Sequence, residues 1–147
     1  MIKTLDTLFQ RDLENLKTEI SSYKAEKNLW KISGTIKNSA GNLCLHLCGN
    51  LQHFIGAVLG NSDYVRNRET EFSRKNVPVK ELVKEIELTT TVVEKTLNNL
   101  KEVQLKETFP INVFSYEMTT EYFLVHLATH LNYHLGQINY HRRLLDN

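Results

Sequence analysis

The sequence lacks the features that would place it outside ordinary globular domains. It has 2 prolines and 6 glycines in 147 residues, and 41% of its residues are hydrophobic, which excludes collagen-like and disordered chains. Its 2 cysteines are too few for a disulfide framework, so a reducing compartment is expected. Lys plus Arg (18) nearly cancels Asp plus Glu (17), which argues against nucleic-acid or polybasic membrane binding.

No targeting segment is visible at the start of the sequence. Charged residues interrupt every apolar run within residues 1–22, whereas a signal-peptide core needs about 7–15 apolar residues. Together with the low cysteine content, this predicts a cytoplasmic protein with no membrane contact.

Apolar residues recur at spacings of three and four through most of the chain, which is the pattern of amphipathic helices. Four such segments are predicted as helices: residues 2–20, 39–59, 78–101 and 119–145. A connector at 24–37, a polar loop at 61–77 and a short extended or hairpin segment at 108–116 separate them. The sequence therefore predicts an all-α fold, a four-helix bundle with long connections, as a single domain over residues 1–147.

The second predicted helix carries no charge, because residues 38–62 contain no Lys, Arg, Asp or Glu. Ser39 is its expected N-cap and Gly60 its expected C′ residue. A membrane span is excluded because several polar residues would be costly in lipid: Asn42, His46, Asn50, Gln52 and His53. An uncharged helix is expected to be buried on most sides, against its own bundle and also against a second copy of the chain.

Histidine is the unusual residue, with six in the chain and four of them in the last 22 residues. His126, His130 and His134 are four apart, so they share one helix face and suit metal binding. The three cannot bind the same ion together, because His126 and His134 are about 12 Å apart along the helix axis. The pair is therefore either His126/His130 or His130/His134, and one further ligand is expected from His46 or His53.

Polar side chains form a stripe on each of these two helices, which suggests a lined cavity between them. The first stripe comprises Ser39, Asn42, His46, Asn50, His53 and Ala57, and the second Thr119, His126, His130, His134, Gln137 and His141. Cys44 and Cys48 lie about 200° around the helix from His46, so they are expected to be buried core residues that do not bind the metal.

The segment NYHLGQINYHRR resembles the end of the last helix in the DinB-like superfamily of metal-binding four-helix proteins. In that family the second ligand histidine of the last helix precedes a residue-Gly-Gln triplet, as His134 does here. The resemblance implies that His130 and His46 complete the metal site, whereas His53 and His126 are outside the motif. It also implies a divalent ion such as zinc or nickel, and frequent homodimers.

Three neutral imidazoles leave one coordination position open, which is typical of catalytic rather than structural zinc sites. Relatives in the resembled family include transferases that use bacillithiol or mycothiol, so we expect a metal-dependent thiol S-transferase acting on an electrophilic small molecule. No catalytic base is assigned from the sequence. Two alternatives remain, namely a non-enzymatic dimeric metal-binding stress protein and a metal-dependent hydrolase acting through bound hydroxide.

Overall fold

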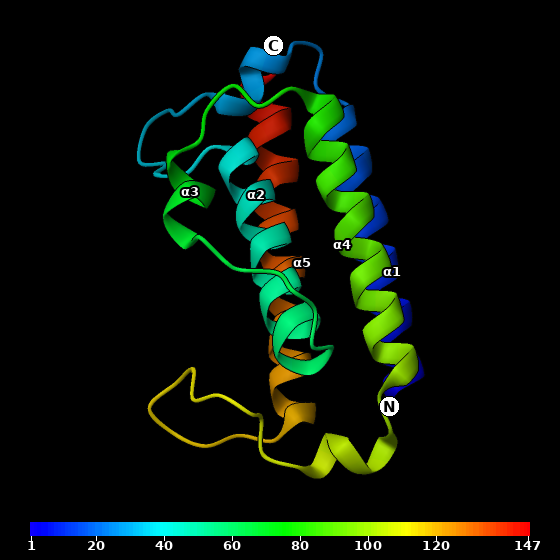
Figure 1. Cartoon of the computed structure of the whole chain (residues 1–147). Coiled ribbons are helices and arrows are strands. Elements are labelled where there is room, and N and C mark those ends of the chain that lie inside the picture. The colour runs from blue at the N-terminus through cyan, green and yellow to red at the C-terminus, as the bar shows by residue number, and fades with distance from the viewer.

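The computed structural model describes all residues 1–147, and its regular structure is entirely helical (Figure 1). The four long helices are α1 (Ile2–Ser21), α2 (Ala40–Leu51), α4 (Val79–Asn99) and α5 (Thr120–Leu145). Helix α2 continues as a π-helix, η2 (Gln52–Leu59). Three short elements complete the fold: the 3₁₀ turns η1 (Glu26–Trp30) and η3 (Glu102–Lys106), and helix α3 (Arg68–Ser73).

The long helices pack as a bundle around one apolar core. Helix α1 lies beside α4, and α2 lies beside α5 and runs in the opposite direction to it (Figure 1). The largest buried side chains come from all four long helices, including Phe9, Leu47, Leu82 and Phe123. The predicted all-helical fold is confirmed. The structure adds one short helix, α3, to the four that were predicted, and this helix packs on the outer side of α2.

Side-chain caps fix where the two site-bearing helices begin. The Ser39 hydroxyl accepts a hydrogen bond from the Asn42 amide at 3.2 Å, which confirms the predicted cap of α2. Thr119 caps α5 in the same way through the Tyr122 amide, also at 3.2 Å. Because each helix starts at a defined residue, the register of its histidines is also defined.

Gly60 was predicted to be the C′ residue of the second helix, and this prediction is wrong. Gly60 has a right-handed φ of −96°, and the left-handed residue is Asn61, with φ 52°. A Cβ on Gly60 would collide with the Thr96 hydroxyl of α4 and the carbonyl of Gly56. Glycine is therefore required by the close approach of α4 and not by a left-handed turn.

Two predicted connectors differ from the structure. The segment 61–77, expected to be a loop, contains α3, whose N-cap Asn67 accepts a hydrogen bond from the Thr70 amide at 3.3 Å. The segment 108–116 forms no strand, and a single bridge joins Thr108 to Thr119. Hydrogen bonding at the two ends of this loop ties it to the start of α5 instead of pairing it along its length.

The absence of charge in α2 is explained within one chain. Every residue of α2 from Ala40 to Leu51 is buried, against α1, α3, α4 and α5. The residues that remain half-buried in this segment lie in η2, at His53 and at 57–59. The expected contact of this helix with a second copy is therefore not needed to explain its composition. No helix of the protein combines the length and hydropathy required to cross a membrane.

Candidate metal centre

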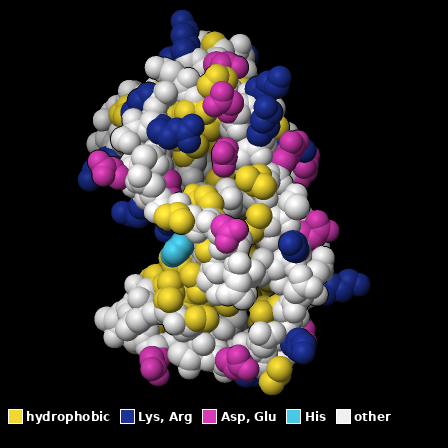
Figure 2. Space-filling model, in the orientation of Figure 1, with side chains coloured by type: hydrophobic (Ala, Val, Ile, Leu, Met, Phe, Trp, Pro, Cys, Tyr) yellow, Lys and Arg dark blue, Asp and Glu magenta, His cyan; other side chains and the backbone are white.

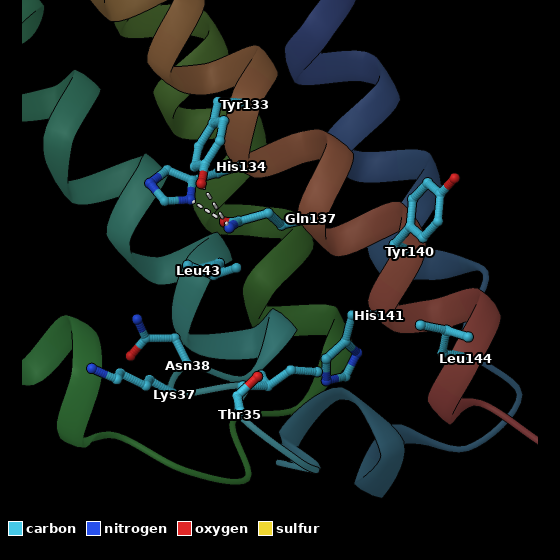
Figure 3. A pocket seen from close by; sticks show the side chains of 11 residues that line it. Thr35, Lys37, Asn38, Leu43, Tyr133, His134, Gln137, Tyr140, His141 and Leu144 are labelled. Carbon is cyan, nitrogen blue, oxygen red and sulfur yellow. Dashed lines mark hydrogen bonds between the residues drawn. The ribbon is translucent and has the colours of Figure 1, made fainter.

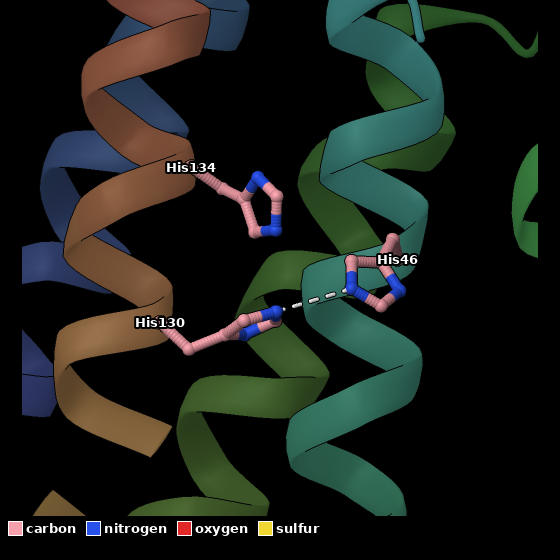
Figure 4. Close-up of side chains that lie close together, drawn as sticks. All are labelled: His46, His130 and His134. Carbon is pink, nitrogen blue, oxygen red and sulfur yellow. Dashed lines mark hydrogen bonds between the residues drawn. The ribbon is translucent and has the colours of Figure 1, made fainter. Parts of the chain in front are cut away.

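Three histidines from two helices converge on one point (Figure 4). His46 extends from α2, and His130 and His134 extend from successive turns of α5. The Nε2 atoms of His46 and His130 are 3.3 Å apart, and one nitrogen of each histidine lies within 4.8 Å of the other two. Two nitrogens bound tetrahedrally to one zinc ion are about 3.4 Å apart, so the three donors are placed to bind a single ion.

A buried carboxylate orients His46 from the side opposite α5. Glu71, in α3, accepts a hydrogen bond from His46 Nδ1 at 2.9 Å. The Arg66 guanidinium donates to both Glu71 oxygens, each at 2.9 Å. A carboxylate in this position holds the imidazole proton on Nδ1, so the lone pair of Nε2 points to the centre of the site.

Glu71 remains ionised in this arrangement. Burial would raise the pKa of its carboxyl group, but hydrogen bonds from His46 and Arg66 outweigh this effect and lower the pKa below its ordinary value. Neither Arg66 nor Glu71 was predicted from the sequence, because they lie in a polar segment 20 and 25 residues from His46. The one available signal was a pair of opposite charges five residues apart.

His134 is oriented by a neighbour on its own helix. Its Nδ1 lies 2.7 Å from Gln137 Oε1, and the Gln137 amide donates to the Tyr133 hydroxyl at 3.3 Å (Figure 3). With its Nδ1 proton donated to Gln137, His134 keeps its Nε2 lone pair free for the centre of the site. Gln137 thus lies where it can orient His134.

The two cluster histidines of α5, His130 and His134, are held in the neutral form. Burial, together with the nearby His134 and His46, lowers the pKa of His130 to about 3. Burial also lowers the pKa of His134, although its hydrogen bond to Gln137 opposes the shift. Metal binding requires unprotonated imidazole, and the fold provides that form at neutral pH.

His126 and His53 lie outside the three-histidine cluster. His126 stacks on Phe123 with an interplanar angle of 17°, and its ring centroid is 6.1 Å from that of His130. His53 packs against Phe54 at 4.7 Å between ring centroids. Of the two pairs left open by helix geometry, the structure therefore brings His130 and His134 together with His46 and leaves out His126 and His53.

His141 has a separate structural position, although it shares the polar stripe. Its Nδ1 lies 2.7 Å from the Tyr23 hydroxyl, and its Nε2 donates to the Lys31 carbonyl at 2.9 Å. Both nitrogens are therefore occupied in joining α5 to the segment that follows α1. This leaves His141 without a free nitrogen for a metal ion.

The two cysteines are buried and free, as expected. The hydrogen bond between Cys44 and Cys48, together with burial, raises the pKa of the Cys44 thiol. Neither residue belongs to the three-histidine cluster. A protonated thiol is a poor metal ligand, so a mixed cysteine–histidine site is not formed here.

A cavity of about 530 Å³ adjoins the cluster, with His134 in its wall (Figure 3). It lies between the segment before α2 and the second half of α5, and its lining includes Lys37, Leu43, Tyr133, Gln137, Tyr140 and Leu144. The cavity beside His134 therefore has room for a small molecule. Figure 2 shows one face of the molecule, on which a hollow carries one histidine and a group of hydrophobic side chains.

The predicted cavity lined by both polar stripes is not what the structure shows, because only His134, Gln137 and His141 of the second stripe line this cavity and no residue of the first stripe does. Asn42 turns away from it, because its amide donates to the carbonyls of Glu71 and Arg74 at 3.0 and 2.8 Å. These bonds attach α3 to α2 beside the site. Asn42 therefore helps to position Glu71 and does not contact a bound molecule.

Gly49 provides the space that Glu71 occupies. A Cβ at Gly49 would overlap a Glu71 carboxylate oxygen, so we expect Gly49→Ala to displace that carboxylate, destabilise the fold by about 1–3 kcal/mol and weaken metal binding. Chemical denaturation and a metal-binding titration measure the two effects. Gly136→Ala is the control, since nothing lies within 4 Å of a Cβ there and a stabilisation of about 0.5–1 kcal/mol is expected. Equal metal affinity in the two variants would contradict the assigned role of Gly49.

The fold and the site together define an all-helical protein with a three-histidine cluster arranged to bind a metal ion. The chain belongs to the DUF1572 family, described as a protein of unknown function, whose model matches residues 2–147. Its structure is similar to the crystal structure of a conserved protein from Enterococcus faecalis, with a TM-score of 0.75 and 19% identity. That match covers 99% of this chain and 96% of the other, and it shows the shared fold. No curated protein matches the sequence.

Proposed function

We propose that this protein is a DinB-like metal-dependent enzyme of the cytoplasm, a thiol S-transferase with one zinc or nickel ion bound by His46, His130 and His134. The observation that carries the proposal is the convergence of three imidazole nitrogens within 4.8 Å beside a cavity. Imidazole suits both metals, and three neutral ligands leave the charge of the ion uncompensated. An ion bound in this way has an open position for a substrate.

The bound ion would supply the acidity that a thiol substrate needs, because metal coordination deprotonates thiols. The thiolate sulfur would form a bond to an electrophilic carbon as the bond from that carbon to its leaving group breaks. The leaving group would depart with the bonding pair, and the thiol proton would pass to solvent. The cavity beside His134 offers Lys37, Tyr133 and Tyr140 as polar partners for the substrates.

Metal analysis and a thiol-consumption assay test this proposal together. We expect about one ion per chain, and metal-dependent loss of a low-molecular-weight thiol in the presence of a chloroalkyl electrophile. His130→Ala should lose both properties, whereas His141→Ala should keep both. Turnover of an ester without thiol would instead identify a hydrolase, and bound metal without either activity would identify a non-enzymatic metal-binding protein.

We also propose that the protein is a homodimer. A groove between α1 and α5 supports this proposal. It has a volume of about 480 Å³ and is lined mainly by apolar side chains, including Leu5, Leu8, Val125 and Ala128. Val125 is 42% exposed and Tyr133, at the edge of the groove, is 65% exposed. A charged substitution there, Val125→Glu, should convert a dimer to a monomer in sedimentation experiments, and a monomeric wild-type protein would refute the proposal.

A further inference from the structure

Each of the three clustered histidines has a second ring nitrogen, Nδ1, that faces away from the centre of the site. Only two of these three nitrogens have a hydrogen-bond partner. Those of His46 and His134 have partners, in Glu71 and Gln137. Nδ1 of His130 is buried and has no hydrogen-bond partner. Metal-binding histidines almost always donate their second ring N–H to an acceptor, so His130 lacks a contact that the other two histidines have.

An unpartnered acceptor lies on the neighbouring helix. Asn50 is one turn beyond His46 in α2, so its side chain projects from the same face of the helix. It is 7% exposed, and its Oδ1 is buried without a partner. Only three buried side-chain atoms in the protein lack a partner, and Asn50 Oδ1 and His130 Nδ1 are two of them.

Neither atom has a partner within hydrogen-bond reach, so a bridging water or a rotation of the Asn50 side chain is needed to join them. Without an ion, the proton positions also make the two atoms mismatched. Glu71 holds the proton of His46 on Nδ1, so His46 Nε2 can only accept a hydrogen bond. The 3.3 Å contact between the two Nε2 atoms therefore requires His130 to carry its proton on Nε2. In this tautomer His130 Nδ1 is an acceptor, and it cannot bond to the Asn50 oxygen, which is also an acceptor.

Metal binding reverses this mismatch. An ion that takes the Nε2 lone pair of His130 requires the proton to move to Nδ1, which then becomes a buried donor. A buried donor without a partner is costly, typically by about 1–3 kcal/mol, and Asn50 Oδ1 is an acceptor with no other partner. The two unsatisfied atoms become complementary only when the ion is present.

We propose that Asn50 is a positioning residue of the metal site: its Oδ1 accepts the His130 Nδ1 proton, directly or through one buried water, when the metal is bound. This inference rests on the proposed binding of a metal by the three histidines. It gives each histidine its own outer contact, from Glu71, Gln137 and Asn50.

Zinc affinity, measured by competition with a chromophoric chelator, tests the proposal without any assay of activity. We expect Asn50→Ala to weaken zinc binding about 10–100-fold. Asn50→Asp retains an acceptor oxygen and should recover most of the affinity. Asn28→Ala is the matched control, because Asn28 also has a buried, unpartnered Oδ1 but donates its amide to Asp146, away from the site. It should bind zinc as the wild type does.

Nitrogen-15 NMR of the wild-type protein provides a second measurement that does not depend on whether a variant folds. Zinc should shift His130 from the Nε2–H to the Nδ1–H form, and the new proton should be protected from exchange. Unchanged affinity in Asn50→Ala, or a freely exchanging His130 Nδ1 proton, would overturn the role of Asn50 and leave the three-histidine site intact. A wild-type protein that binds no zinc would instead refute the proposed metal site itself.

Discussion

Replacing His130 by alanine is expected to abolish tight metal binding. His130 contacts both of the other donors in the cluster: its Nε2 is 3.3 Å from that of His46, and it lies one helical turn from His134. Apparent binding free energies of about 10–16 kcal/mol for four-ligand zinc sites correspond to about 3 kcal/mol per ligand, or roughly 100–1,000-fold in affinity. Elemental analysis after gel filtration measures the result.

The other histidines provide the comparison for this prediction. His46→Ala and His134→Ala should lose metal to the same extent, because each removes one of three donors. His141→Ala should retain metal, since both of its ring nitrogens are already bonded, to Tyr23 and Lys31. Full metal occupancy in any of the three cluster variants would show that the ligand set is wrong.

Replacing Glu71 by alanine is expected to affect both the fold and the site. Its carboxylate is 5% exposed and accepts three hydrogen bonds, one from His46 and two from Arg66. Removing it leaves the Arg66 charge without its partner in a largely buried position, which typically destabilises a protein by about 3–5 kcal/mol. Urea denaturation of the metal-free protein measures this loss directly.

The same substitution should weaken zinc binding, because His46 would lose the contact that fixes its proton on Nδ1. Glu71→Gln separates the two effects. Its amide oxygen can still accept from His46, but it carries no charge opposite Arg66, so intermediate affinity and stability are expected. Glu69→Ala, an exposed change in the same helix, is the control. If Glu71→Ala matched this control in both measurements, the proposed role of Glu71 would be wrong.

The sequence identified the helices well because their signals are local. The three- and four-residue spacing of apolar side chains predicted α1, α4 and α5, and the cap at Ser39 is confirmed. Helix α3 was not predicted, because its six residues are too few to show a period. The role of Gly60 in the structure was also not predicted, because contact with Thr96 of another helix, not the local turn, requires glycine there.

For the site, the sequence determined that His126, His130 and His134 share one face, because helix geometry fixes the positions of residues four apart. Residue spacing alone left two histidine pairs open. Only the packing of α2 against α5 decided that His46 lies beside His130 and His134. Likewise, Glu71 and Arg66 reach His46 only because α3 folds back on α2. Sequence periodicity describes single helices, whereas contacts between segments depend on how those helices pack.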